Sequence, residues 1–302
     1  MAEKESIKKE PEQKVCLITG ANAGIGKAAA IQLAVKGLHV FIACRNITRG
    51  KQALAEIKDQ SKSESVDLIK MDLSSRDSIH SAVEEFTGRI QKIDMLIHNA
   101  ADFDISRKQA EYSPEGIEII WATNHLGPVF LTNLLLPNIK KSEQGRIIMV
   151  ASQGLVMHPN LKVNLEDPEF REGSYSPGKA YYQSKLAQVM YTYWLAEQLK
   201  VSNITANCIR VTNVKVDLKR YPNVSGFMKF LYSIKSKFSI SPEDMAKTYT
   251  YLATSRELDD VSGKYFNEKN QIVSSSKYSL QKQNIKAVME LTQKYIDINL
   301  NN

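Results

Sequence analysis

The 302-residue chain has few of the features that mark secreted, metal-binding or membrane-spanning proteins. Its three cysteines, Cys16, Cys44 and Cys208, lie in separate apolar runs without paired spacing, so we expect buried reduced thiols instead of disulfides. The five histidines are scattered with no metal-ligand spacing, and we assign no metal site. No apolar run approaches the roughly 20 residues that a membrane-spanning helix needs. These absences favour a soluble, cytoplasmic protein.

The chain also lacks internal repeats and linkers rich in glycine, proline or serine. Its first thirteen residues are almost wholly polar and contain no apolar run. We therefore expect residues 1–13 to form a disordered tail, not a signal peptide or membrane anchor, and residues 14–302 to form a single domain.

The positive charge is concentrated in one window. The net charge is +7, and residues 214–240 hold six basic residues against one acid, Asp217. Such a window can attract cofactor phosphate, an acidic substrate or an anionic membrane surface. Its aromatic residues are spaced for burial and not for base stacking, which argues against nucleic-acid binding.

Large apolar side chains recur at helical spacing within residues 226–238, flanked by lysines. This stripe favours a helix packed on its own domain. The alternative is a substrate lid, at about 214–240, that makes peripheral contact with a membrane through 226–238.

Short apolar runs alternate with helical patterns along the chain, which predicts an α/β fold of the Rossmann type: a doubly wound, seven-stranded, mainly parallel sheet with helices on both faces. Strands are expected at residues 14–19, 38–43, 66–71, 93–98, 145–151, 203–210 and 263–267. Helices are expected at residues 25–36, 48–59, 75–91, 114–139, 177–200, 241–254 and 280–298. The loop at 153–178 is long, and long loops in compact domains tend to be functional.

A glycine-rich turn, TGANAGIG, follows the first strand and opens a helix at once. Gly20 permits the tight turn, Gly24 lets the backbone approach a pyrophosphate, and Gly26 lets the helix lie close to the sheet. The helix N-terminus then offers free N–H groups to the phosphates. The turn predicts a dinucleotide site that includes Gly20, Asn22, Ala23, Gly24, Ile25 and Gly26.

The residue type at the end of the second strand indicates which of the two nicotinamide cofactors, NAD or NADP, the site prefers. An acid there would hydrogen-bond the ribose hydroxyl of NAD, but this chain has Cys44, Arg45 and Asn46. Arg45 can bind a phosphate in bidentate fashion, and Lys27 or Arg49 can assist. We expect the cofactor to be NADP(H), with Arg45 and Asn46 in its site.

Tyr181 and Lys185 lie four residues apart in an expected helix, which places a phenol and an ammonium on one face. A nearby cation favours the phenolate form, which suits Tyr181 to proton exchange. Ser152 lies upstream at the end of a strand. Together with the dinucleotide loop, these three residues make a hydride-transfer site.

The sequence resembles the short-chain dehydrogenase/reductase family from Lys14 to Ile298, because its motifs occur in the family's order. These motifs are TGANAGIG, MDLS (71–74), HNAA (98–101), NHLG (124–127), Ser152 and YYQSK (181–185). Within the family the chain looks most like the retinol dehydrogenase and WW-domain oxidoreductase branch. That likeness rests on ACRN (43–46), the long loop before Tyr181, AYYQSKLAQ (180–188), SPED (241–244) and SGKYF (262–266).

The resemblance implies four catalytic residues. Tyr181 would be the general acid/base, while Lys185 would hold the nicotinamide ribose and favour the Tyr181 phenolate. Ser152 would hydrogen-bond the substrate carbonyl, and Asn124 would organise a water for proton relay.

The resemblance also implies cofactor contacts. Asp72 would accept a hydrogen bond from the adenine amino group, Leu73 would pack nearby, and Asn99 would line the ribose. The remaining candidates for cofactor binding are Ala100, Ala101, Thr212 and Val214, with Tyr181 and Lys185.

The chain departs from the family's pattern at several positions. Ala101 stands where a glycine is usual, Val211 and Thr212 replace a Pro-Gly pair, and Val216 stands where a threonine would hold the nicotinamide end. The last two departures place nicotinamide positioning by this segment in question.

We therefore expect an NADP(H)-dependent oxidoreductase that interconverts a carbonyl and an alcohol on a small lipophilic substrate, such as a retinal-like aldehyde or ketone. One alternative is a C=C reductase of the protochlorophyllide-reductase type, and another is a non-catalytic NADP(H)-binding regulator. The helices expected at 114–139 and 177–200 are long enough to pair between subunits of a homodimer or homotetramer.

Overall fold

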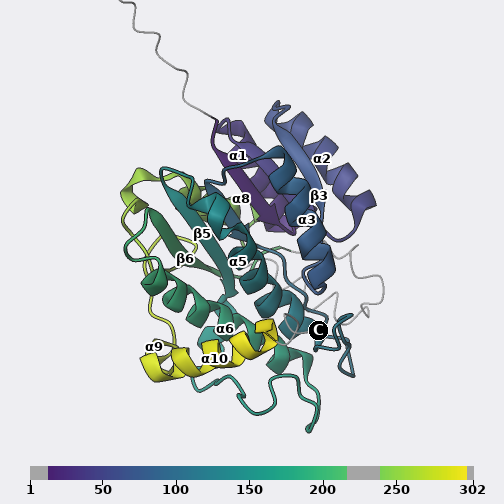
Figure 1. Ribbon diagram of the computed structural model, residues 1–302, viewed down its shortest axis with the longest axis vertical. Coiled ribbons are helices and arrows are strands. Elements are labelled where there is room, and N and C mark those ends of the chain that lie inside the picture. The colour runs from purple at the N-terminus through teal and green to yellow at the C-terminus, as the bar shows by residue number, and fades with distance from the viewer. Residues whose placement is uncertain (1–12, 216–238, 298–302) are drawn as a thin grey trace, which may run out of the picture.

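The computed structural model describes residues 13–215 and 239–297. Its centre is one sheet of seven strands (Figure 1). The strands are β1 (Val15–Thr19), β2 (His39–Cys44), β3 (Val66–Lys70), β4 (Met95–His98), β5 (Gly145–Ser152), β6 (Ile204–Val211) and β7 (Tyr265–Phe266). They pair in the order β3-β2-β1-β4-β5-β6-β7, and each of these pairs is parallel. The predicted Rossmann-type fold is confirmed.

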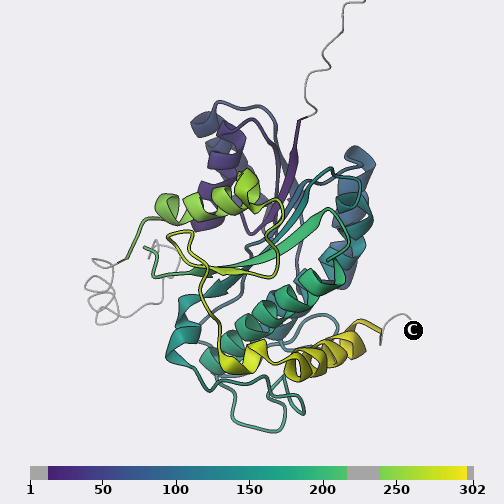
Figure 2. The ribbon, with the colours of Figure 1, turned by 90° about the vertical axis from the view of Figure 1, so that its left-hand side faces the viewer.

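Two layers of helices bury the two faces of the sheet, as expected for parallel strands that are apolar on both sides. Four helices pack on one face: α3 (Arg76–Arg89), α5 (Gly127–Ile139), α6 (Pro177–Gln198) and α10 (Lys282–Asp297). Three helices pack on the other: α1 (Gly24–Val35), α2 (Ile47–Ser61) and α8 (Pro242–Thr254). Figure 2 shows α8 against α1, and α10 beside α6 at the bottom of the molecule.

The helix expected at 114–139 begins five residues later than predicted. A turn occupies the difference, because Gly116 has a φ of +73° and the backbone N–H of Glu118 donates to Glu169 Oε2 at 2.8 Å. The helical run then passes through α4 (Ile119–Trp121) and a π-helical turn, η1 (Ala122–Leu126), into α5. Hydrophobic periodicity reports neither the positive φ nor the contact with a residue fifty positions away.

Three short elements were not predicted: the 3₁₀ turns η2 (Gln153–Met157) and η4 (Arg256–Leu258), and α9 (Lys277–Leu280). The amphipathic stripe at 226–238, Val216 and most of the alternative lid at about 214–240 lie outside the described residues.

The helical run Ile119–Ile139 is 21 residues long and has a mean hydropathy of 1.2, so by length and composition it could cross a membrane. This differs from the expectation that no run reaches that length. Inside the fold, 72% of its apolar 18-residue window is buried, as in a core helix of a globular domain.

Candidate functional site

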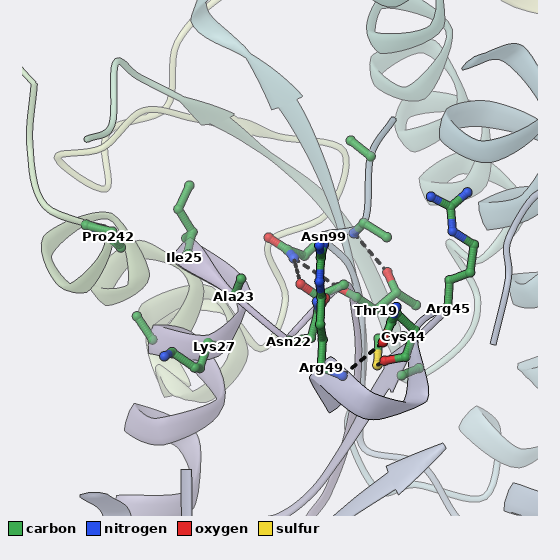
Figure 3. Close-up of a pocket in the computed structure, with 18 of the residues that line it drawn as sticks. Thr19, Asn22, Ala23, Ile25, Lys27, Cys44, Arg45, Arg49, Asn99 and Pro242 are labelled. Carbon is green, nitrogen blue, oxygen red and sulfur yellow. Dashed lines mark hydrogen bonds between the residues drawn. The ribbon is translucent and has the colours of Figure 1, made fainter. Parts of the chain in front are cut away.

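A cavity of about 750 Å³ opens at the carboxyl ends of β1, β2 and β4. The order of the strands reverses at the boundary between β1 and β4, and open α/β sheets bind their ligands at such a switch point. Figure 3 shows Lys27 and Ile25 on one side of this cavity, Arg45 on the other and Arg49 between them.

The glycine-rich turn forms the floor of the cavity. Gly20 and Gly24 have φ angles of +67° and +58°, in the left-handed region that glycine adopts without strain. At Gly26 a Cβ would overlap the Asn99 side-chain amide and lie 2.8 Å from the Gly20 carbonyl oxygen. The turn therefore requires glycine for its backbone path and for its close packing on β4.

The N-terminus of α1 fits an anionic group. Its N-cap residue, Ala23, makes no side-chain capping bond, and the first turn of the helix holds no acidic residue. The positive end of the helix dipole and the uncapped N–H groups therefore face the cavity. This is the donor set that a pyrophosphate requires.

Asn99 fastens the turn to β4. Its Nδ2 donates to the carbonyl oxygens of Thr19 at 2.9 Å and Gly20 at 3.2 Å, and its Oδ1 accepts from the Tyr249 hydroxyl at 3.1 Å. The side chain that we predicted to line a ribose therefore also holds the glycine turn in place.

Cationic side chains gather where β2 ends. Arg45, Arg49 and Lys27 all line the cavity. The Arg45 side chain is 67% exposed and its Nε lies 3.9 Å from Asp72 Oδ2, whereas Lys27 forms an ion pair with Glu56. Because Arg45 is only loosely held, its guanidinium can turn toward a phosphate in the cavity.

Asp72 lies after β3 and is held by the following turn. Its Oδ1 accepts from the Ser74 backbone N–H at 2.9 Å and from the Ser74 hydroxyl at 2.7 Å. The carboxylate thus sits in one orientation at the edge of the cavity, where Leu73 also lies.

Most of the predicted cofactor residues come together here. Those that line the cavity are Gly20, Asn22, Ala23, Gly24, Ile25, Gly26, Arg45, Asn46, Asp72, Leu73, Asn99, Ala100, Ala101 and Val214. Tyr181 and Lys185 do not line the cavity and lie on α6, in the region that we predict to be catalytic. Thr212 donates a hydrogen bond to Gln153 Oε1, directly after Ser152 in the chain.

Residues 211–215, where the sequence departs from the family's pattern, are hydrogen-bonded to the rest of the fold. β6 ends at Val211, and Val214 then forms a parallel bridge with Ile240. Lys215 N–H donates to the Ile240 carbonyl and Ile240 N–H donates to the Asn213 carbonyl, both at 3.0 Å. The replacement of Pro-Gly therefore leaves the residues on either side of 216–238 hydrogen-bonded to each other.

Lys185 is a buried ammonium. It is 1% exposed, and its Nζ donates to the Val150 carbonyl at 2.8 Å and to Gln188 Oε1 at 2.9 Å. Burial lowers the pKa of Lys185 to about 8. The ammonium lies 5.7 Å from the centre of the Tyr181 ring, so the two groups predicted to act together are neighbours.

Ser152 and Tyr181 border the same region. Ser152 ends β5, two residues after the carbonyl that binds Lys185, and its Oγ accepts from Gly154 N–H at 3.1 Å. The Tyr181 ring packs on Phe103, with ring centres 4.2 Å apart.

Asn124 lies in the π-helical turn, where the widened backbone turns its side chain inward. Its Oδ1 accepts from Asp102 N–H at 2.7 Å, and its Nδ2 donates to the Asp102 carbonyl at 3.0 Å and to Ser184 Oγ at 3.1 Å. Asp102 lines the cavity and Ser184 precedes Lys185, so the hydrogen bonds of Asn124 connect the cavity to the helix that carries Tyr181 and Lys185.

Sequence reasoning missed three side chains in this region. Gln188, the acceptor for Lys185, was detectable from its position three residues along the same helix. Phe103 and Tyr249 had no such signal, because they reach Tyr181 and Asn99 only through the tertiary fold. Within residues 13–215 and 239–297, no group of three or more His, Cys, Asp or Glu side chains is placed to hold a metal ion.

Sequence comparison agrees with this architecture. A model of the short chain dehydrogenase family matches residues 14–163. Retinol dehydrogenase 11 of Mus musculus is 34% identical over 255 residues, which cover 84% of this chain and 78% of that protein. The chain belongs to the short-chain dehydrogenase/reductase family, and its members bind a nicotinamide cofactor.

Other relatives place it in the retinol dehydrogenase-like branch of that family. Retinol dehydrogenase 12 of Homo sapiens is 35% identical over 255 residues, covering 84% of this chain and 78% of that protein. Retinol dehydrogenase 13 of Homo sapiens is 34% identical over 256 residues, covering 84% and 76%. The chain is thus similar to oxidoreductases of this branch along most of its length.

Solved structures show the same fold. An uncharacterised protein from Mycobacterium paratuberculosis superposes with a TM-score of 0.70 at 26% identity, covering 93% of this chain and 92% of that one. A short chain dehydrogenase from Shigella flexneri, solved in complex with NADP, superposes with a TM-score of 0.65 at 20% identity, covering 85% and 97%.

Proposed function

We propose that this protein is an NADP(H)-dependent oxidoreductase that interconverts a carbonyl and an alcohol on a lipophilic substrate, with Tyr181 as general acid/base. The observation that carries the proposal is the buried Lys185 ammonium beside the Tyr181 ring, adjoining a cavity fitted for a dinucleotide. A cation so buried favours the phenolate form of its neighbour.

The cofactor site favours NADP(H) over NAD(H). Arg45 stands at the end of β2, where an acid would select NAD, and Arg49 and Lys27 line the same end of the cavity. Arg45 and Arg49 would hold the additional phosphate, the N-terminus of α1 the pyrophosphate, and Asp72 the adenine amino group. The bound cofactor would supply or accept the hydride.

The residues around the substrate carbonyl have separate tasks. Tyr181 gives a proton to the substrate oxygen or takes one from it, and Ser152 hydrogen-bonds that oxygen. Lys185 holds the ribose and stabilises the Tyr181 phenolate, while Asn124 orders the backbone at Asp102 on the side facing the cofactor.

A lipophilic substrate is supported by the surface around Tyr181. Phe103 packs on the Tyr181 ring, and its own side chain is 37% exposed. Val156 and Met157 lie in η2, which packs on the helix that carries Tyr181, and they are 55% and 79% exposed. The relatives carry the name retinol dehydrogenase, which denotes a lipophilic alcohol as substrate.

Replacing Tyr181 tests the proposal. Tyr181→Phe keeps the ring but removes the hydroxyl, so we expect kcat for retinal reduction to fall by ~10²–10⁴ while the Kd for NADPH changes less than about threefold. Tyr182→Phe is the matched control, because it removes the neighbouring hydroxyl and keeps a ring that packs on both His158 and Tyr181. Retention of more than about a tenth of the rate in Tyr181→Phe would exclude Tyr181 as the general acid.

The two alternative functions, C=C reduction and cofactor-dependent regulation, predict different outcomes of the same assay. A C=C reductase would saturate an enone and leave its carbonyl intact, and a regulator would bind NADPH tightly without consuming it. The complete set of Ser152, Tyr181, Lys185 and Asn124 favours turnover over regulation, and the hydrogen bonds that hold residues 213–215 to 240 remove one reason to expect a degraded site.

A further inference from the structure

Gln188 lies one helical turn after Lys185 and on the same face of α6. Its side chain is wholly buried, and its Oε1 accepts a hydrogen bond from Lys185 Nζ at 2.9 Å. Because an ammonium can only donate, the atom facing it must be the oxygen of the amide. The Gln188 Nε2 is buried and has no hydrogen-bond partner among the described residues.

An unpartnered buried amide nitrogen costs stability, because it loses its hydrogen bonds to water and gains none in the fold. An apolar side chain at this position, in the middle of a buried helix, would avoid that cost. The one polar contact that Gln188 makes through its side chain in the described structure is the bond to Lys185. The hydrogen bond to Lys185 therefore explains an amide at this position, whereas packing does not.

The groups that face Lys185 leave its charge largely uncompensated. Tyr181 lies on the same helix, the Cys208 thiol approaches from β6, and the Val150 carbonyl binds it from β5. The Cys208 thiol stays protonated, since burial raises the pKa of Cys208 to about 12. Among the described residues no carboxylate lies within ion-pair distance of Lys185 Nζ, and its two acceptors, the Val150 carbonyl and the Gln188 amide, are neutral.

We infer that Gln188 is a positioning residue that fixes the Lys185 ammonium beside Tyr181 with a neutral acceptor, so that the full positive charge acts on the phenol. This inference rests on the proposed role of Tyr181. A carboxylate at the same position would cancel much of that charge, and an apolar side chain would leave the ammonium less stabilised.

Titration of the cofactor-free protein tests the inference without turnover. The protein is labelled with ¹³C at lysine Cε and tyrosine Cζ, and the Lys185 and Tyr181 signals are assigned from Lys185→Met and Tyr181→Phe. Because neighbouring groups titrate as a pair, the pH at which the pair loses its first proton is compared among variants.

Two substitutions should move that pH in opposite directions. Gln188→Glu adds a negative charge and should raise it by about one unit or more, whereas Gln188→Met removes the acceptor and should lower it by about half a unit or more. Gln183→Met is the matched control, because this buried amide on the same helix binds Asn164 and Pro168 instead. Its titration should match the wild type.

Kinetics supply the second readout. With all-trans-retinal and NADPH, Gln188→Glu and Gln188→Met should each lower kcat about tenfold or more while the KM for NADPH changes less than about threefold. Titrations within about 0.2 units of the wild type in both folded variants would overturn the inference and leave Gln188 a packing residue. If Tyr181→Phe were fully active but the Gln188 titrations shifted as stated, the proposed function would fail while the positioning of Lys185 would stand.

Discussion

Lys185 keeps an ammonium in an interior that ordinarily excludes charge, and Arg45 keeps a guanidinium almost free at the rim of the cavity. The two cations differ in what restrains them. Among the described residues Lys185 is fixed by two neutral acceptors, whereas Arg45 has one ion-pair partner at 3.9 Å and a side chain that is 67% exposed. A fixed cation suits catalysis and a loosely held one suits recognition of a ligand that arrives from solvent.

Reversing the charge at position 45 should therefore reverse the cofactor preference. Arg45→Asp removes a phosphate ligand and supplies an acceptor for a ribose hydroxyl, so we expect the ratio of kcat/KM for NADPH to that for NADH to fall below one. Arg89→Asp, which alters a surface ion pair with Glu85 on α3, is the control for added negative charge. An unchanged ratio in Arg45→Asp would make Arg45 an ordinary surface residue.

Among the structural elements, the glycine turn and helix α1 pack so closely that Gly26 has no room for a side chain. Gly26→Ala should cost about 1–3 kcal/mol of unfolding free energy and weaken NADPH binding, because its Cβ would displace the Asn99 amide that holds the turn. Gly88→Ala near the end of α3 is the matched control. A Cβ there meets nothing within 4 Å, so this variant should gain up to about 1 kcal/mol.

Urea unfolding measures the free energy of unfolding of the two glycine variants, and an NADPH titration measures the affinity of Gly26→Ala for the cofactor. Equal stabilities for Gly26→Ala and the wild type, with equal NADPH affinity, would show that Asn99 can shift without consequence and that the turn tolerates a side chain.

The sequence predicted the seven strands to within a few residues, because most of them are short apolar runs that the fold buries. The edge strand β3 is the exception, since Leu68 is half-buried and Lys70 is exposed. The glycine turn, Ser152, Tyr181 and Lys185 were equally readable, since local spacing places them at strand ends or on one helix face. The π-helical turn at Asn124 was not, because hydrophobic periodicity does not distinguish a π-helical turn from an α-helix, and the bonds from Asn124 to Asp102 and Ser184 form only in the fold. Phe103 could not be predicted either, because only the fold brings it against Tyr181.

At the scale of the whole molecule, two buried histidines make the fold sensitive to acid. His98 and His125 each bond a threonine hydroxyl through Nε2, and burial lowers the pKa of each to about 3. Both stay neutral in the folded protein, while in the unfolded chain they take up protons below pH ~6.5. The unfolded state binds more protons between pH 6.5 and 3, so stability falls as the pH falls through that range.

We therefore expect the unfolding free energy to drop on acidification from pH 7 to 4.5 by up to about 1.4 kcal/mol per pH unit for each histidine. The double variant His98→Gln, His125→Gln cannot titrate at these positions and should show a shallower loss. Urea denaturation at several pH values measures both proteins. Parallel curves would mean that other groups control the acid sensitivity.

The packing of helices within one chain limits which surfaces remain for contact between subunits. Residues 183–192 of α6 are all buried within one chain, and α10 packs against this helix. Of the two helices considered for pairing, α6 therefore has little surface left for a partner, while α5 exposes Asn133 and Pro137. The oligomeric state stays a prediction, and the described residues favour a partner surface other than α6.

The proposed function requires that hydride pass between the nicotinamide and a carbonyl carbon. The most direct measurement uses NADPH deuterated at nicotinamide C4, prepared separately for each face, with all-trans-retinal as substrate and mass spectrometry of the product. We expect one of the two labelled cofactors to place a single deuterium on the carbinol carbon of retinol. Deuterium at a saturated C=C bond, or tight NADPH binding with no labelled product from retinal or from a panel of other aldehydes and ketones, would contradict this function.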